Sequence, residues 1–314
     1  MITVIARRLL TLIPVLIAIS FVSFLLLALI PGDPAVVMLG ADAPPQALER
    51  LRAQLGLDRP FLERFGWWLW SAARGDLGTS LYQQRPVALM VMERLPVTLL
   101  VCVFATIISV VVGVGLGVIA AVQRNRLTDH VVRVLSLVGL SMPDFWFGLI
   151  LILTFSIRYP IFPITGFVPL DRDLFASLQF FVLPSLALGL TLAGFLTRLT
   201  RASMLEVLSA DYVRTARSKG LRARTVVLRH ALGTALLPLV TVVGLNFGRL
   251  LGGAIVIETV FSLPGVGRLI VLAINQRDFP VVQAAVLYVA VIFTIVNLLT
   301  DLSYVVLDPR VRYS

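Results

Sequence analysis

Charge is scarce in this sequence of 314 residues: charged side chains make up 14% of it and hydrophobic ones 58%. A soluble domain usually has about 25% charged residues, and 14% is too little to cover the surface of a water-soluble globule. Cysteine is almost absent, and the single Cys102 excludes a disulfide-stabilised scaffold. The composition therefore predicts a protein that crosses a membrane several times.

Residues that commonly carry chemistry are also few. The only lysine, Lys219, is followed by Gly220, so the G-x-x-x-x-G-K-[ST] phosphate loop is missing and nucleotide hydrolysis must belong to another chain. The two histidines, His130 and His230, lack ligand-spaced partners, and Cys102 stands alone, which predicts no metal site. No G-x-S-x-G elbow is present. We therefore expect no catalytic residue and no cofactor in this chain.

The net charge of +10 has a simple explanation in a membrane protein. Its basic residues are spread over several loops instead of forming one patch, which argues against nucleic-acid binding. Cytoplasmic loops of membrane proteins are enriched in Lys and Arg.

Long apolar runs, in contrast, are abundant. A helix needs about 20 mostly apolar residues to cross a bilayer, and a spanning run must be helical because lipid cannot satisfy exposed backbone groups. The sequence predicts an all-α fold, with residues 1–314 forming a single transmembrane domain. Its six expected spans are residues 9–30, 97–122, 134–157, 179–196, 236–257 and 281–307.

The basic residues predict the direction of the spans. With the N-terminus inside, the inner segments hold 15 basic residues and the two shorter outer loops hold four, as the positive-inside rule requires. Both termini are then cytoplasmic. Residues 31–96 and 258–280 are expected outside, and residues 197–235 inside.

The first outer loop, residues 31–96, balances seven acidic residues against seven arginines and contains Trp67, Trp68 and Trp70. This composition favours docking of a protein over contact with lipid. The alternative is a lid that packs on the mouth of this subunit itself.

Polar side chains inside spans are costly and therefore candidate functional sites. Asp144, Asn246 and Arg249 are the candidates for a path through the membrane. Asp144 follows Pro143, which kinks or interrupts a helix. The alternative is that Asp144 and Arg249 form a structural ion pair. The glycines at 113, 115, 117, 248, 252 and 253 indicate close helix contacts.

The basic inner loop predicts a helix over residues 204–220. Leu205, Leu208, Tyr212 and Ala216 would form one apolar stripe, and Gly220 stands where a helix commonly ends. A second short helical segment is expected at 224–232. The first helix could transmit force from a soluble partner or lie on anionic lipid, and composition alone leaves both roles open.

The amino-acid sequence of this loop resembles that of a known protein family. Residues 211–221, DYVRTARSKGL, with HAL at 230–232 and ALLP at 235–238, resemble the "EAA" coupling loop of ABC importer permeases of the dipeptide, oligopeptide, glutathione and nickel group. Further segments resemble the same group in order along the chain: PGDP at 31–34, LGLDRP at 55–60, RGDLGTS at 74–80, SMPxFW at 141–146, GGA at 252–254, ETVF at 258–261, PGVGR at 264–268, RDFP at 277–280 and DPRVRY at 308–313. Asp144 stands at the variable position x of the fourth of these segments, so no role for it follows from the resemblance.

The resemblance implies an ATPase-coupling role for the residues of the inner loop, namely Asp211, Tyr212, Arg214, Ala216, Arg217, Lys219, Gly220 and Leu221. Ala216 would allow a close approach to the partner. The general motif begins with glutamate and two small residues where this chain has Arg214-Thr215-Ala216, so only Ala216 and Gly220 carry over directly.

The resemblance also implies an assembly in the bacterial or archaeal cytoplasmic membrane. This chain would be the first of two different permeases, working with two ATPase subunits that bind ATP and Mg, and with an extracytoplasmic binding protein. Its substrate would be a peptide or a related small molecule, moved by alternating access. The alternative function is an ion-coupled secondary transporter.

Overall fold

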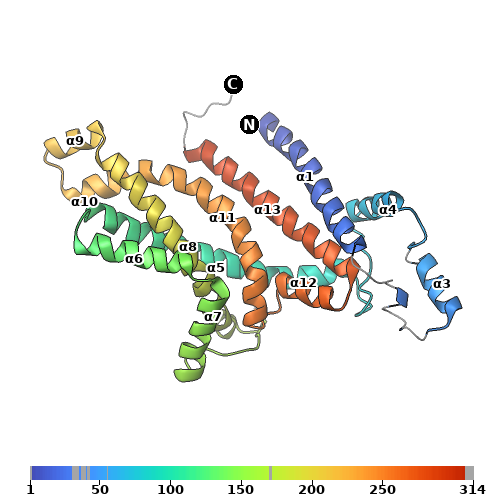
Figure 1. Cartoon of the computed structure of the whole chain (residues 1–314). Helices are drawn as coiled ribbons and strands as arrows, with labels where there is room; N and C mark the ends of the chain where they lie inside the picture. The colour runs from blue at the N-terminus through green and yellow to red at the C-terminus, as the bar shows by residue number, and fades with distance from the viewer. Residues whose placement is uncertain are drawn as a thin grey trace. The chain divides into compact units, whose positions relative to one another are not determined.

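The computed structural model describes residues 2–29, 35–36, 40, 43–54, 56–169 and 172–307, and their regular structure is helical apart from one isolated bridge between Thr79 and Pro86 (Figure 1). The PGDP and DPRVRY segments lie outside the described residues. The chain divides into two compact units. One contains residues 1–96 and 264–294, and the other contains residues 97–263 and 295–314.

The first unit has a core built around a short helix. It contains α1 (Ile2–Ala28), α3 (Pro45–Gln54), α4 (Phe61–Ala73) and α12 (Val266–Asn275), with the beginnings of α5 (Val87–Val122) and α13 (Phe279–Leu307). In α12 the side chains of Val266, Leu269, Ile270 and Ala273 are buried, which is the i, i+3, i+4, i+7 spacing of one helix face. This face packs on buried residues of α5 and α13.

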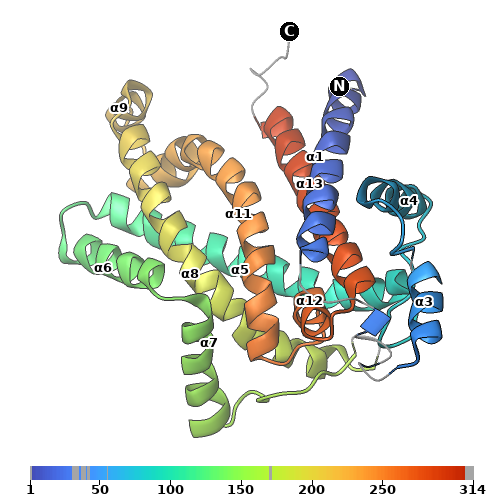
Figure 2. The same ribbon diagram turned by 45° about the vertical axis from the view of Figure 1, so that its right-hand side comes forward.

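The second unit is arranged around α8 (Leu174–Leu208), which packs against α6 (Leu127–Ser141), α7 (Asp144–Ile152) and α11 (Leu232–Val260) (Figure 2). The π-helical segment η1 (Leu153–Arg158) continues α7. Beyond the end of α8 come α9 (Asp211–Ser218), α10 (Ala223–Thr225) and the π-helical segment η2 (Val226–Ala231), which leads into α11.

Glycines let helices of this unit approach closely. A Cβ added to Gly113 of α5 would lie 2.6 Å from the Cβ of Leu196, and one added to Gly117 would lie 2.5 Å from the Cβ of Thr200, both on α8. A Cβ on Gly253 would lie 2.9 Å from a methyl of Leu188. The prediction of close helix contacts is confirmed at these three positions and is wrong at Gly115 and Gly252, where a Cβ would meet nothing within 4 Å.

Several helices are long and apolar enough to cross a membrane. Four qualify singly: Val87–Val122, Leu174–Leu208, Ala223–Val260 and Phe279–Thr300. A fifth crossing results if the pair Leu127–Ser141 and Asp144–Arg158 is counted as one span. In α1, the stretch Ile13–Leu26 is a shorter apolar helix. The structure is therefore that of a polytopic all-α membrane protein.

The third and fourth expected spans differ from the sequence prediction. The pair that forms the third is bent by 101°, so residues 134–157 are not one straight helix. The break falls at Met142-Pro143, since proline has no backbone N–H to donate. The fourth, expected at residues 179–196, extends over 35 residues as α8, because Asp173 caps its start and Pro184 does not end it.

Candidate functional site: the basic loop and the polar residues of the spans

Residues 204–220 belong to two helices, α8 and α9, instead of the single helix that the sequence predicts. α8 ends at Leu208, and the hydroxyl of Ser209 donates to the carbonyl of Glu206 at 2.7 Å. Such side-chain bonds to the backbone compete with helix continuation. Ala210 is extended, with φ −67° and ψ 148°, and Asp211 then begins α9. The short helix α9 therefore changes direction after α8 and does not prolong it (Figure 1).

Two residues attach α9 to the rest of the loop. The side chains of Val213 and Ala216, three positions apart, are buried against Val226 of η2. Tyr212 was expected in the apolar stripe but is 47% exposed, and its hydroxyl donates to Thr234 Oγ1 at 3.3 Å. Ala216 faces its own chain, so the expectation that it leaves room for a partner's close approach is not supported.

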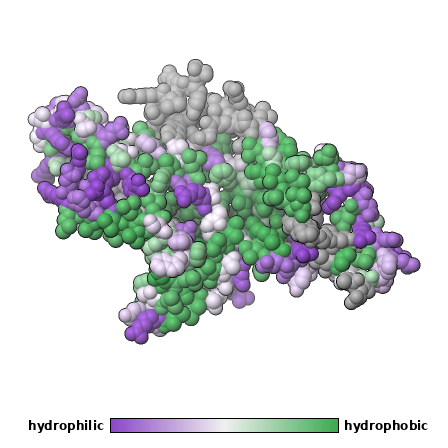
Figure 3. All heavy atoms as spheres, viewed as in Figure 1, coloured by the Kyte–Doolittle hydropathy of each residue, from purple (hydrophilic) through white to green (hydrophobic). Residues whose placement is uncertain are grey.

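The opposite side of α9 is open and hydrophilic, as Figure 3 shows over α9 and α10 at the left of the view. The side chains of Asp211 and Arg214 are 98% and 70% exposed, and their 3.6 Å ion pair is of the weak surface kind. The other exposed residues of the segment 211–221 are Tyr212, Thr215, Arg217, Ser218, Lys219, Gly220 and Leu221. This side carries basic groups and hydrogen-bonding groups but few apolar ones.

Gly220 ends this segment as the sequence predicts. Lys219 caps α9, and Gly220 follows with φ +75°, a left-handed conformation that strongly favours glycine. A Cβ at Gly220 would meet nothing within 4 Å. The requirement for glycine at this position is therefore conformational and does not come from crowding.

Asp144 and Arg249 lie on different helices and do not pair. Asp144 is the first residue of α7, directly after Pro143, and a Cβ on Gly253 of α11 would lie 3.3 Å from its Oδ2. Arg249 is exposed and donates to Asn246 Oδ1 at 3.3 Å, while Asn246 Nδ2 donates to the carbonyl of Val242 at 2.7 Å. No ion pair joins Asp144 to Arg249 within the part of the chain that the structure describes.

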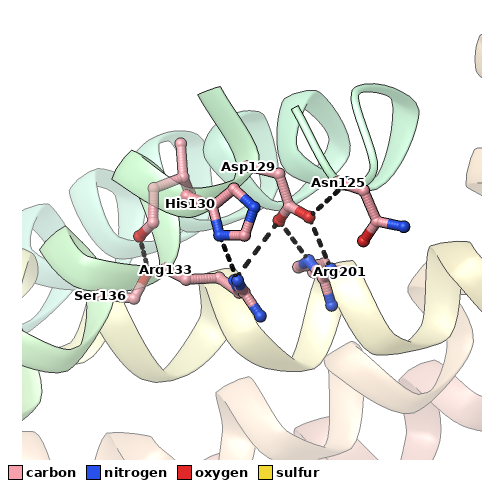
Figure 4. A network of polar contacts seen from close by, with 7 residues as sticks. Asn125, Asp129, His130, Arg133, Ser136 and Arg201 are labelled. Atoms are coloured by element: carbon pink, nitrogen blue, oxygen red, sulfur yellow. Dashed lines mark hydrogen bonds and ion pairs between the residues drawn. The ribbon is translucent and has the colours of Figure 1, made fainter. Parts of the chain in front are cut away.

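The structure adds a polar network that the sequence did not reveal (Figure 4). Asp129, at the start of α6, is fully buried and accepts from Arg201 Nε at 2.7 Å and Arg201 Nη2 at 2.8 Å. The backbone N–H of Asn125 donates to the same carboxylate at 3.0 Å. The network fixes the turn between α5 and α6 to α8, two turns before α8 ends and α9 follows. The available signal was that Asp129 is the only acid in a basic loop.

A second unforeseen contact joins two segments of the first unit. Asp278, 2% exposed, accepts a short hydrogen bond from the hydroxyl of Ser80. It also accepts from the backbone N–H groups of Leu81 and Tyr82, at 3.1 and 3.3 Å. Two of the segments that resemble the importer group, RGDLGTS and RDFP, are therefore held together by one carboxylate.

Glu258 is a further buried acid that the list of polar residues omitted. It lies on α11, is 0% exposed, and its Oε1 accepts from Thr98 Oγ1 of α5 at 2.6 Å. The sequence placed Glu258 just outside the fifth span, so its burial was not expected.

Two family models account for almost all of the chain. Residues 113–313 match the "binding-protein-dependent transport system inner membrane component" model, and residues 1–102 match the model of its N-terminal part. The chain belongs to this family. It is accordingly a permease subunit of an ATP-binding-cassette importer and a component of the inner membrane.

Transport permeases of several bacteria are similar to this permease along nearly its full length. A putative peptide transport system permease protein of Brucella abortus is 42% identical over 313 residues, which cover 100% of both chains. The dipeptide transport system permease protein DppB of Alkalihalophilus pseudofirmus is 42% identical over 327 residues, covering 98% of each chain. The glutathione transport system permease protein GsiC of Escherichia coli (strain K12) is 42% identical over 313 residues, covering 100% of both.

Proposed function

We propose that this permease imports short peptides or closely related molecules as one of two different permeases in its complex. Two ATPase subunits would supply the energy, with ATP and Mg bound in those subunits, and an extracytoplasmic binding protein would deliver the substrate. The names of the relatives, which specify peptide, dipeptide and glutathione transport, support the substrate class.

In this proposal α9 is the element on which an ATPase subunit acts. The observation that carries it is the division of α9 into a buried pair, Val213 and Ala216, and an exposed hydrophilic side. The buried pair fixes α9 to η2, and η2 continues into α11. A push on the exposed side is thereby passed to a membrane helix. A helix lying on lipid would instead present apolar residues on its free side, and α9 has few of them there.

The proposed topology has six crossings with both termini in the cytoplasm. It counts α1, the bent pair α6 and α7 with η1, and the four single long helices. The inner side then holds the basic loop of residues 197–235 and the outer side holds residues 31–96 and 258–280, as the distribution of basic residues requires. The binding protein would dock on the outer loop in the region of residues 74–80.

Asp144, Asn246 and Arg249 are proposed to line the path. Asp144 sits at the N-terminus of α7, where the helix dipole stabilises a negative charge without a counter-ion. Its neighbour on α11 is the glycine Gly253, so no bulky side chain from that position covers the carboxylate. A charge held in this way can meet a charged group of a passing peptide.

The coupling proposal is tested with Gly220→Val and Arg214→Glu in complexes reconstituted with their ATPases and binding protein. Valine is strained at φ +75°, and Arg214→Glu reverses the charge at the exposed side, so both should uncouple ATP hydrolysis from uptake while the complex still inserts. Gly233→Ala, on a helical glycine with open space around it, is the matched control. Wild-type coupling in both variants would show that α9 is not the ATPase contact.

The substrate proposal is tested separately with the binding protein and ATPases that assemble with this permease. Labelled dipeptides, glutathione and a nickel chelate are offered to the loaded complex, and uptake is followed with and without ATP. We expect ATP-dependent uptake of the peptides. Uptake of the nickel chelate alone would refute the peptide assignment without affecting the coupling argument.

A further inference from the structure

The helix α4 of the first outer loop has one side that packs on the membrane helix α1. The rings of Phe61, Phe65 and Trp68 lie on α4 at i, i+4 and i+7, and they contact Phe21 and Phe24 of α1 with centroid distances of 5.3–6.1 Å. Arg64 adds a cation–π contact to Phe24 at 5.7 Å. α4 is thus attached to α1 along a single aromatic stripe.

The free side of α4 is exposed and largely apolar, and its one acidic residue, Glu63, is 48% exposed and forms an ion pair with Arg59 at 3.4 Å. Leu62, Trp67 and Trp70 are 70%, 58% and 56% exposed, and three of the four tryptophans of the whole chain lie in this 13-residue helix. No residue of α4 is buried. Exposed residues of this size are unfavourable in water, so the free side needs a covering.

Arginines accompany the exposed tryptophans. The guanidinium of Arg74 lies 4.4 Å from the ring centre of Trp70, and that of Arg59 lies 5.6 Å from Trp67. Such an arrangement, with apolar rings on one side and cationic groups at their edge, matches the boundary between lipid headgroups and acyl chains. The rings would enter the apolar layer, the guanidinium group of Arg74 would reach the phosphates, and that of Arg59 would lie at the same level beside Glu63.

The position of the aromatic contact on α1 places α4 at the depth of a membrane–water interface. Phe24 and Phe21 precede the end of α1, Ala28, by four and seven residues, which is about 6 and 10 Å along a helix axis. Interfacial helices bury their apolar side by about 5–10 Å. The side chains of Val22, Leu25 and Leu26 on α1 are also exposed and apolar, like those on the free side of α4.

The direction of α4 relative to α1 also fits a helix that lies in the membrane interface. Its contacting rings extend over seven residues, about 10 Å of its axis, while the two phenylalanines that they meet are only three residues, about 4.5 Å, apart on α1. α4 therefore crosses α1 and does not run alongside it, as Figures 1 and 2 show. A helix that crosses a membrane span lies closer to the membrane plane.

We propose that α4 is an interfacial helix whose exposed side, Leu62, Trp67 and Trp70 with Arg59 and Arg74, is seated among the phospholipids of the leaflet at the C-terminal end of α1. This assignment replaces the expectation that the tryptophan cluster contacts a protein. Arg74 then belongs to the lipid contact, and the proposed docking region for the binding protein is confined to residues 75–80. The helix fixes the depth of the first outer loop.

The helix α3 provides an internal contrast. It has a similar length and lies in the same loop, but its sequence PQALERLRAQ contains three charged residues and no aromatic residue. Its Ala53 is exposed, as is Ala73 of α4. The alanine pair allows the same substitution in a helix expected in water and a helix expected in lipid.

The test places a nitroxide spin label at Leu62→Cys, Ala73→Cys or Ala53→Cys in the full transporter, from which Cys102 and the partners' cysteines have been removed. The complex is reconstituted in phosphatidylglycerol–phosphatidylethanolamine bilayers, with and without binding protein. Collision of the label with oxygen, which concentrates in lipid, is compared with collision with a water-soluble nickel chelate by power saturation.

We expect the labels at 62 and 73 to collide more with oxygen than with the chelate, at a shallow depth, and the label at 53 to show the opposite. Binding protein should leave the values at 62 and 73 unchanged. High chelate access at 62 and 73 would show that α4 faces water. Low access to both reagents, or protection that appears only with binding protein, would show that a protein covers it. Either result overturns the proposal.

Discussion

Asp129 and Arg201 form a two-point ion pair across α6 and α8, with Nε–Oδ1 and Nη2–Oδ2 distances of 2.7 and 2.8 Å (Figure 4). The carboxylate is completely buried and the arginine side chain is 20% exposed. Arginine suits this role because its planar fork matches both carboxylate oxygens. Arg201 lies seven residues before the end of α8. The pair therefore fixes the position of the last turns of α8, which precede α9.

Removing one partner of this pair should destabilise the complex strongly. Arg201→Met leaves Asp129 buried without its main partner, a situation that costs about 3–5 kcal/mol. We expect a lower thermal unfolding temperature of the purified complex, measured by tryptophan fluorescence. The double variant Asp129→Asn with Arg201→Met should regain part of the loss. Arg133→Met is the control, since Arg133 Nε lies 3.9 Å from Asp129 and its side chain is 47% exposed.

Replacing a glycine of α5 with alanine should destabilise the protein at the crowded Gly113 and not at the open Gly115. Gly113→Ala would bring its Cβ to within 2.6 Å of the Cβ of Leu196 and 3.0 Å of the carbonyl of Ala193. Relief of such overlap costs about 1–3 kcal/mol. Gly115→Ala, two residues away with nothing within 4 Å, should be neutral or stabilising by up to about 1 kcal/mol, because alanine favours a helix. Equal unfolding temperatures of the two variants would contradict the close packing of α5 on α8.

Loss of the Asp278 carboxylate should loosen the segment that follows Thr79. Asp278→Ala leaves the hydroxyl of Ser80 and the N–H groups of Leu81 and Tyr82 without their acceptor, at about 1–3 kcal/mol for each buried group. We expect faster protease cleavage near residues 81–85 in membrane vesicles with this loop accessible. Ser80→Ala removes only one donor and should have the smaller effect.

The features that the sequence predicted correctly depend on neighbouring residues. Pro143 interrupts its helix because it lacks a donor, and Gly220 ends the α9 segment because it adopts a positive φ. Neither property needs knowledge of the tertiary structure. The apolar runs predicted the four long apolar helices for the same reason, because the length and composition of a run can be read directly from the sequence.

The features that the sequence did not reveal join distant residues. Asp129 and Arg201 are 72 residues apart, and Ser80 and Asp278 are 198 apart, so only folding brings them together. The wrong prediction that Tyr212 lies in an apolar stripe has a local cause, the turn that separates α8 from α9. The stripe through Leu208, Tyr212 and Ala216 assumes one continuous helix, and the turn at Ser209–Ala210 breaks that continuity and exposes Tyr212.

Neutralising Asp144 should change transport without disturbing assembly. Because no ion pair joins it to Arg249 in the described residues, and because the start of α7 stabilises its charge, Asp144→Asn removes no counter-ion contact. We expect a wild-type amount of complex and a change of about fivefold in the uptake ratio of cationic to neutral dipeptides. This corresponds to the ~1 kcal/mol that two unit charges exchange at 4 Å in water.

The measurement compares initial uptake of cationic, neutral and anionic dipeptides into proteoliposomes that contain the complex, binding protein and ATP. Asp58→Asn, which neutralises an exposed acid of the first outer loop, is the control for a general effect of charge. Arg249→Gln should shift the ratio in the opposite direction if both residues face the same path. An Asp144→Asn complex that assembles normally and transports all three peptides at unchanged relative rates would remove Asp144 from the path, and reduced assembly would show that its role is structural.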